Sequence, residues 1–349
     1  MPTLFDSLQL GDITLPNRII MSPLTRCRAD AGRVPSALML EYYVQRASAG
    51  LIIAEATSVC PMGVGYPNTP GLWSQEQVEG WKKITKAVHD AGGRIFAQLW
   101  HVGRISAPLY LDGQVPVAPS AIKPAGHVSL VRPEQGYVTP RALETSEISG
   151  VVEHFRKAAM NAQMADFDGV EIHGANGYLL DQFLQDSSNQ RTDEYGGSVE
   201  NRARLLLEIT DAAASVFGPE LVGVHLSPRC DTHDMGDSDR LGTFSYVVRE
   251  LREAGIAFLC VREHAGEDAI GPTLKKIFRG PYIANEGFTK ESAEAALAAG
   301  TADAVAWGRN FIANPDLVAR FHQNAPLNTQ DHKTFYASGP EGYTDYPTL

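Results

Sequence analysis

Three polar side chains close the stretch Gly169–Tyr178, which reads GVEIHGANGY. They are His173, Asn176 and Tyr178. A histidine and an asparagine can together donate two hydrogen bonds to one oxygen atom, and a neighbouring tyrosine can supply a proton. Two donors that hold a developing negative charge beside a weak acid suit the reduction of an activated double bond or of a nitro group.

The apolar run before these residues is typical of a parallel barrel strand that ends at a ligand site. We predict eight such strands, at Arg18–Met21, Leu51–Glu55, Arg94–Leu99, Gly169–Ile172, Leu221–Leu226, Ala257–Val261, Pro281–Ala284 and Ala304–Trp307. Amphipathic runs with helix-cap signals predict helices at Gln75–Ala91, Ser146–Ala165, Ser198–Phe217, Leu241–Ala254, Lys290–Ala299 and Asn314–Gln323.

Eight strands that alternate with helices predict an α/β fold, a (β/α)₈ TIM barrel, with residues 1–349 as one domain. A doubly wound open sheet is the alternative, and it is weaker because no GxGxxG motif follows the first strand. The connection over residues 101–145 is too long for an ordinary loop, so we predict a small β excursion that caps the barrel mouth. Residues 324–349 are predicted to pack on the barrel as coil.

In this fold, active sites sit at the carboxyl ends of the strands. The predicted strand ends carry Thr25, Ala56, Thr57, Gln98, Trp100, His101, His173, His225, Arg262, Asn285, Gly308 and Arg309. Alternation along the strands predicts that Phe96, Gln98 and Trp100 share one face of their strand. In the strand that begins at Gly169, Val170 and Ile172 are predicted to face the helices, and His173 the barrel interior. The amides of Gly287 and Gly308 and the guanidinium of Arg309 would suit a phosphate. Tyr66 and Trp100 could instead be ordinary core aromatics.

The composition excludes several classes of function. The chain has 349 residues and a formal net charge of −11, which argues against nucleic acid or an anionic membrane as the main partner. Its four cysteines form no CxxC pair, so zinc–thiolate and iron–sulfur sites have no support. The absence of a signal peptide and of an apolar run near 18 residues predicts a cytoplasmic protein. We expect a monomer that acts on small molecules.

The chain resembles the Old Yellow Enzyme family of FMN-dependent ene-reductases along nearly its full length. The matching stretches are Asn17–Arg28, Glu55–Thr57, Ala97–Arg104, Gly169–Phe183, Arg191–Arg204, Phe311–Leu317 and Gly342–Leu349. Within the family it is most similar to the bacterial xenobiotic reductase B branch, whose members act on nitrate esters and nitroaromatics. The resemblance implies tightly bound FMN, NADPH as reductant with NADH as the alternative, and ping-pong transfer of hydride through flavin N5 to enones, maleimides, nitroalkenes, nitrate esters or nitroaromatics.

The resemblance also implies a role for individual positions. His173 and Asn176 would bind the substrate's oxygen, and Tyr178 would be the proton donor. The isoalloxazine would be lined by Pro23, Leu24, Thr25, Ala56 and Gln98, with Thr25 on its O4 edge. Gly287, Gly308 and Arg309 would hold the FMN phosphate, and Tyr66, Trp100 and Tyr336 would shape the substrate pocket.

Two positions depart from the family's pattern. Most relatives carry Arg near the flavin N1 and O2 edge, where this chain has His225. Because histidine can be neutral whereas arginine is always charged, the stabilisation of reduced flavin here is a separate question. The thermostable branch has Cys at the position of Thr25, and this chain has its cysteine two residues later, at Cys27.

Two other functions stay open at the sequence level. A TIM-barrel hydrolase could bind a metal through His101, His173, His225 and Asp231, although their spacing is poor for this. A flavin-binding protein without turnover is the other alternative, which the presence of the proton donor Tyr178 disfavours.

Overall fold

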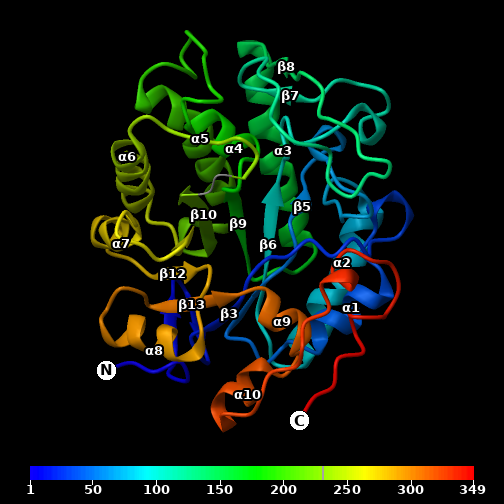
Figure 1. Ribbon diagram of the computed structural model, residues 1–349, viewed down its shortest axis with the longest axis vertical. Coiled ribbons are helices and arrows are strands. Elements are labelled where there is room, and N and C mark those ends of the chain that lie inside the picture. The colour runs from blue at the N-terminus through cyan, green and yellow to red at the C-terminus, as the bar shows by residue number, and fades with distance from the viewer. Residues whose placement is uncertain (230–231) are drawn as a thin grey trace.

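The computed structural model describes residues 1–229 and 232–349. Eight parallel strands form its centre: β3 (Ile19–Met21), β4 (Leu51–Ile53), β6 (Ile95–Trp100), β9 (Gly169–Gly174), β10 (Val222–Arg229), β11 (Phe258–Glu263), β12 (Tyr282–Asn285) and β13 (Ala304–Trp307). They pair in the order β4-β3-β13-β12-β11-β10-β9-β6, and the pairing of β6 with β4 closes the ring. Each overlaps a predicted strand, so the predicted TIM barrel is confirmed (Figure 1).

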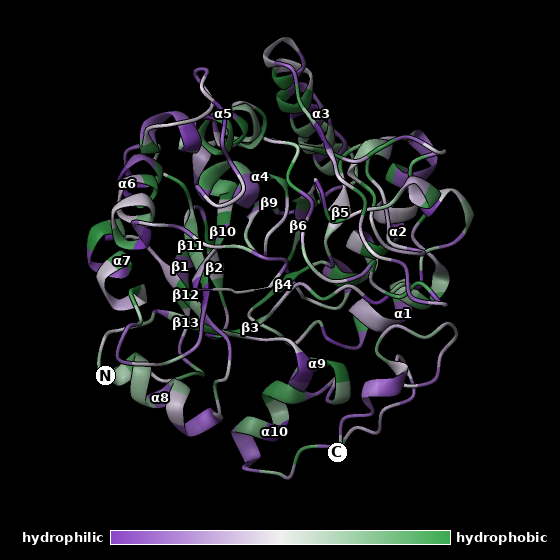
Figure 2. Ribbon diagram, turned by 45° about the horizontal axis from the view of Figure 1, so that its top comes forward, coloured by the Kyte–Doolittle hydropathy of each residue, from purple (hydrophilic) through white to green (hydrophobic). Residues whose placement is uncertain are grey.

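Helices surround the strands (Figure 2). They are α1 (Ala37–Val44), α2 (Gln75–Asp90), α3 (Thr145–Met164), α4 (Leu179–Leu184), α5 (Val199–Phe217), α6 (Arg240–Glu253), α7 (Gly271–Phe278), α8 (Lys290–Ala298), α9 (Arg309–Ala313) and α10 (Leu317–Gln323). Short 3₁₀ turns lie at Ala31–Arg33, Pro61–Gly63, Pro108–Tyr110, Pro219–Leu221 and His332–Thr334. Among the helices described here, none is long and apolar enough to cross a membrane.

The six predicted helices are present, and four others were missed. The helix predicted from Asn314 begins only at Leu317, after a separate short helix α9. Of the missed helices, α4 is buried along its whole length, so its sequence carries no amphipathic period. Helix α7 has only eight residues and begins with Gly271 and a proline, so its sequence carries a weak helix signal.

The alternation of side chains in the strands follows the prediction. Phe96 belongs to an apolar cluster inside the barrel, whereas Val170 and Ile172 pack with the helices. An additional hairpin of β1 (Leu8–Leu10) and β2 (Ile13–Leu15), which the sequence did not indicate, adds its own Leu10 and Leu15 to the interior cluster. The turn of this hairpin lies against the backbone of Glu220, just before β10, so the hairpin sits at the amino ends of the strands.

The long connection after β6 lies over the opposite end, as predicted. It contains β7 (Val117–Ala118) and β8 (Arg141–Ala142), which pair in parallel, and an antiparallel bridge between His127 and Gly136. Its residues Val128 and Tyr137 are buried against Tyr66 and Trp100. The excursion therefore brings apolar surface to the barrel mouth.

Three buried arginines hold the C-terminal segment against the barrel. Arg26 donates to the carbonyl oxygens of Phe335 (3.0 Å) and Gly342 (2.9 Å). Arg28 also donates to Phe335, at 2.9 Å. Arg46 donates to carbonyl oxygens of α9 and, at 3.5 Å, to that of Tyr343 in the segment. Because Arg26 directly follows Thr25, the segment is fastened beside the end of the first barrel strand.

Candidate active site

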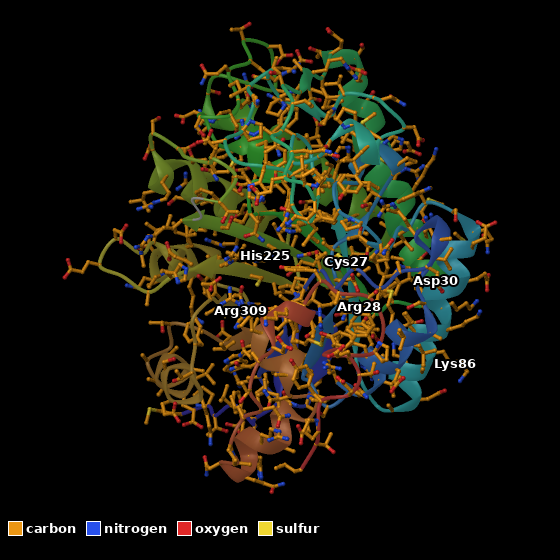
Figure 3. The ribbon with its side chains drawn as sticks, turned by 45° about the vertical axis from the view of Figure 1, so that its right-hand side comes forward. Cys27, Arg28, Asp30, Lys86, His225 and Arg309 are labelled. Carbon is orange, nitrogen blue, oxygen red and sulfur yellow. The ribbon has the colours of Figure 1, made fainter. Side chains whose placement is uncertain are left out.

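A cavity of about 500 Å³ opens at the carboxyl ends of the strands. The residues to which the resemblance assigns a role all line it: Pro23, Leu24, Thr25, Ala56, Tyr66, Gln98, Trp100, His173, Asn176, Tyr178, His225, Gly287, Gly308, Arg309 and Tyr336. Thr57 and His101, which were also placed at strand ends, are not part of this lining. In Figure 3, His225 and Arg309 lie near the middle of the molecule, whereas Lys86 on α2 lies at its edge. The volume is in the range of small-molecule and cofactor sites.

His173 is the penultimate residue of β9 and forms part of the cavity wall. Its ring stacks on that of His225, with the centroids 5.5 Å apart, and meets the ring of Tyr178 edge-on at 5.0 Å. Burial lowers the pKa of His173 well below its ordinary value, so the ring is neutral near pH 7. Its Nδ1 atom is buried without a hydrogen-bond partner among the described residues.

A tight turn carries the next two site residues. Asn176 and Gly177 both have positive φ angles, 60° and 76°, which reverse the chain between His173 and Tyr178. The backbone N–H of Asn176 donates to the Ser227 hydroxyl at 2.6 Å, and that of Gly177 donates to the buried carboxylate of Asp181 at 2.8 Å. A side chain at Gly177 would meet the next loop at 2.8 Å, so this position requires glycine.

The hydroxyl group of Tyr178 lies 2.9 Å from that of Tyr66. Trp100 stacks on Tyr66 at 5.4 Å and meets Tyr178 edge-on at 5.0 Å. Burial raises the pKa of Tyr178 well above its ordinary value, so the hydroxyl keeps its proton at neutral pH. Tyr178 is therefore protonated in the resting protein and can donate its proton to a strong base.

The amide of Asn176 is oriented by a cation. Arg262, at the end of β11, donates from Nη1 to Asn176 Oδ1 at 2.9 Å and also pairs with the carboxylate of Glu286. Because the arginine binds the oxygen end of this amide, its nitrogen end is turned away from Arg262. The sequence reading placed Arg262 at a strand end but gave it no role.

Below the cavity, three buried polar side chains lie on neighbouring strands. Gln98 donates from Nε2 to Glu171 Oε2 at 2.7 Å, and the same nitrogen is 3.4 Å from His225 Nδ1. Burial lowers the pKa of His225 to about 3 and raises the pKa of Glu171 to about 8. Both groups are therefore mostly uncharged near pH 7.

Glycines form the far end of the cavity. Gly287 has a φ angle of 77°, with little around its Cα, and a side chain at Gly308 would approach Leu24 to 3.0 Å. Gly308 immediately precedes the short helix α9, whose first residue is Arg309. The backbone can therefore come close to a ligand here, next to a guanidinium group.

The structure does not assemble the residues of the metal hypothesis. His101 is buried, and its Nδ1 accepts a hydrogen bond from the backbone of Gly103. Within residues 1–229 and 232–349, no group of three or more His, Cys, Asp or Glu side chains could hold a metal ion. Asp231, the fourth candidate, and Cys230 lie outside the described residues.

Several lining residues were missed by the sequence reading. Gln330 and Phe335 come from the C-terminal segment, and Asn310 and Ile312 come from α9. Nothing in their local sequence marks them, because only the docking of the segment brings them to the cavity. Glu171 could have been found, since it is an acid in an otherwise apolar strand and shares the interior face with His173.

The cavity ends in glycines, and its wall carries donors for an oxygen atom and a protonated tyrosine. A barrel can use such a cavity to position a redox cofactor against a substrate. This arrangement suits a flavin-dependent oxidoreductase. Residues 3–328 match the family described as NADH:flavin oxidoreductase / NADH oxidase. The chain belongs to this family and is an NAD(P)H:flavin oxidoreductase of the Old Yellow Enzyme type.

Curated relatives and solved structures agree with this assignment. The chain is 45% identical to 12-oxophytodienoate reductase 1 of Oryza sativa subsp. japonica, over 98% of this chain and 92% of that protein. A probable flavin mononucleotide-dependent alkene reductase of Leishmania infantum is also 45% identical, with 98% and 96% covered. An old yellow enzyme homologue from Zymomonas mobilis (TM-score 0.97, 47% identity) matches over the full length of both chains. Morphinone reductase in complex with tetrahydroNAD (TM-score 0.97, 49% identity) matches over 100% of this chain and 98% of that chain.

These relatives support the family and not one branch of it. The predicted likeness to the xenobiotic reductase B branch therefore bears only on which substrates the protein reduces, and these are considered below.

Proposed function

We propose that this protein uses NADPH to reduce carbon–carbon double bonds activated by a carbonyl or nitro group, with FMN as its bound cofactor. The observation that carries the proposal is the convergence of His173, Asn176 and Tyr178 on one cavity wall. Relatives that are named as alkene, 12-oxophytodienoate and morphinone reductases support it. When bound, FMN would supply hydride chemistry that amino-acid side chains lack.

The residues present fit FMN. Buried nitrogen atoms of His173 and His225 lack partners within the described part of the chain, and a planar ring system with polar edges could satisfy them. Pro23, Leu24 and Ala56 would pack on the ring, with Thr25 and Gln98 at its edges. The phosphate would lie against the amides of Gly287 and Gly308 and the side chain of Arg309.

The chain's own residues would bind and protonate the substrate. Neutral His173 and the oriented amide of Asn176 would donate to the carbonyl or nitro oxygen as negative charge develops on it. Tyr178 would deliver a proton to the α carbon, and Tyr66 would hold the donor hydroxyl in place. The apolar side chains of the excursion and Trp100 would exclude water, which strengthens these interactions.

A second substrate class uses the same donors. Nitrate esters and nitroaromatics carry oxygens that His173 and Asn176 could bind, and their reduction does not require a proton from Tyr178. The resemblance to the xenobiotic reductase B branch, whose members act on such compounds, is the reason for keeping this class. Tyr66, Trp100 and Tyr336 would select among substrates by shape.

One spectroscopic experiment tests the proposal. The purified protein would be mixed with FMN without oxygen, reduced with NADPH, and then given 2-cyclohexen-1-one. We expect the yellow spectrum to bleach and then to return. Bleaching without return would favour nitro compounds or nitrate esters as acceptors, and a protein that binds no FMN would refute the proposal. NADH in place of NADPH tests the choice of reductant.

We further propose that the protein works as a cytoplasmic monomer on small molecules. Its negative net charge of −11 supports the absence of a nucleic-acid partner. Sedimentation velocity of the FMN-loaded protein should give one species near the monomer mass of 37.8 kDa.

A further inference from the structure

Glu171 is an acid inside the barrel, one layer below the cavity. Its side chain is fully buried, and its position on β9 puts it on the same face as His173, two residues later. It does not line the cavity, whose lining at this point is formed by Gln98 and His225. The catalytic roles proposed above leave this carboxyl group without a function.

The hydrogen bonds around Glu171 are few. Oε2 accepts from Gln98 Nε2 at 2.7 Å, and Oε1 has no partner in the part of the chain that the structure describes. Across the same residues, the only ion-pair contact of Glu171 is with His225 Nδ1, at 4.0 Å. A buried carboxylate with one amide donor and no close cation would be strongly destabilised, whereas a neutral carboxylic acid would not.

The contact with Glu171 determines which end of the Gln98 amide faces the cavity. Because the amide nitrogen is directed at the carboxyl group, the amide oxygen is directed away from it. The same nitrogen is 3.4 Å from His225 Nδ1, and because an amide nitrogen only donates, this contact is a hydrogen bond when Nδ1 accepts. A neutral imidazole that accepts at Nδ1 carries its proton at Nε2, which here is buried without a partner among residues 1–229 and 232–349.

We propose that Glu171 is a positioning residue for the cofactor: as an uncharged acid it fixes the Gln98 amide and, through Gln98, holds His225 as the Nε2–H tautomer. This inference rests on the proposed FMN site. The floor of the cavity then offers a carbonyl oxygen and a neutral N–H donor in fixed positions. These are complementary to the alternating donors and acceptors on the edge of a flavin's pyrimidine ring.

Other titratable groups around the cluster are consistent with a neutral floor. Cys260 on β11 is buried in the same interior layer, and burial raises the pKa of its thiol well above its ordinary value, so the thiol adds no charge. Burial and then the charge of Arg262 lower the pKa of His225, and burial is also the main cause of the lowered pKa of His173. The influences on the two rings therefore oppose a second proton on either of them.

Two substitutions of Glu171 distinguish its role as a hydrogen-bond acceptor for Gln98 from the effect of a negative charge. Glu171→Gln keeps an acceptor for Gln98 and carries no charge, whereas Glu171→Leu removes the acceptor. Cys260→Ala is the matched control, because it disturbs packing in the same interior layer without touching Gln98. For each protein we would measure the FMN dissociation constant of the apoprotein, the midpoint potential of the bound flavin, and the ¹⁵N spectrum of the His225 ring, assigned with His225→Gln.

We expect Glu171→Gln and Cys260→Ala to keep FMN affinity within about twofold and to leave the midpoint potential unchanged. Glu171→Leu should weaken FMN binding about tenfold, the effect of losing roughly one oriented hydrogen bond, and its His225 spectrum should change to a mixture of tautomers. A higher potential in Glu171→Gln would mean that Glu171 is normally charged and would overturn the inference. Wild-type behaviour of Glu171→Leu, or an equal loss in Cys260→Ala, would overturn it as well.

The wild-type apoprotein gives an independent test that does not depend on how Glu171→Leu folds. Its His225 ring should already be the Nε2–H tautomer, and an Nδ1–H ring would refute the inference. If the wild-type protein bound no FMN, the proposed function would fail, whereas the tautomer measurement would still decide the role of Glu171.

Discussion

The hydroxyl groups of Tyr66 and Tyr178 lie 2.9 Å apart, although the two residues are 112 positions apart in the chain. Tyr66 follows β5 (Thr57–Ser58) and Tyr178 directly precedes α4, so two separate loops meet over the cavity. Tyr66 is buried and Tyr178 is partly buried, and both pack with Trp100 beneath the long excursion. The proposed proton donor is therefore held by a partner that has the same chemistry.

Removing the hydroxyl of each tyrosine should have different effects. Tyr178→Phe deletes the proton donor, so we expect enone reduction to fall by about 10²-fold or more, within the usual range for general acid catalysis. Tyr66→Phe removes only one hydrogen bond to that donor and should cost less than about tenfold. The comparison requires rates for an enone and a nitrate ester. Equal slowing of both substrates by Tyr178→Phe would contradict the proton-donor role.

His173→Ala should reduce the rate of enone reduction by about 10²–10³-fold, because one of two donors to the developing oxyanion is lost. The measurement is the rate at which the reduced, FMN-loaded protein is reoxidised by 2-cyclohexen-1-one. A rate within a few-fold of the wild type would show that His173 does not bind the reacting oxygen. FMN content must be measured alongside, since His173 also lines the cofactor cavity.

Glu171 should make stability depend on pH. Burial raises the pKa of its carboxyl group from 4.5 to about 8, so between these values the folded protein holds a proton that the unfolded chain releases. The stabilisation is complete below the lower value and is lost as the pH rises toward the higher one. Glu171→Gln removes this titration. Its Tm relative to the wild-type apoprotein should therefore increase from about pH 5 to about pH 8, and a constant difference would argue that Glu171 titrates normally.

Arg26→Ala should loosen the C-terminal segment. Two buried carbonyl groups, those of Phe335 and Gly342, would each lose a charged donor. We expect a loss of about 2–4 kcal/mol of unfolding free energy and faster proteolysis of the segment that carries Phe335 and Tyr336. KM should rise because both residues line the cavity.

Lys86→Ala is the control for this substitution. Lys86 pairs with Asp90 on the surface, where the two side chains are 71% and 66% exposed, so its loss should cost no more than about 0.5 kcal/mol. Unfolding by urea would compare the two variants. Similar losses would mean that the clamp formed by Arg26 contributes little.

The barrel could be predicted because its strands are short apolar runs with polar ends, and this pattern is local. The site could be predicted for the same reason, since His173 follows one such run and Gln98 and His225 stand near the ends of two others. What could not be predicted depends on contacts between distant segments. Leu10 and Leu15 carry no local sign that they fill the barrel interior. Phe335 reaches the cavity because the C-terminal segment docks there, where Arg26 binds the Phe335 carbonyl group.

The hairpin of β1 and β2 closes the amino end of the barrel. Leu10 and Leu15 fill the amino end, and the apolar interior cluster continues above them toward Glu171. Nicotinamide, substrate and product must therefore all pass through the mouth, one after another. The excursion packs against Tyr66 and Trp100 at that mouth, so its sequence is where relatives with the same chemistry can come to prefer different molecules.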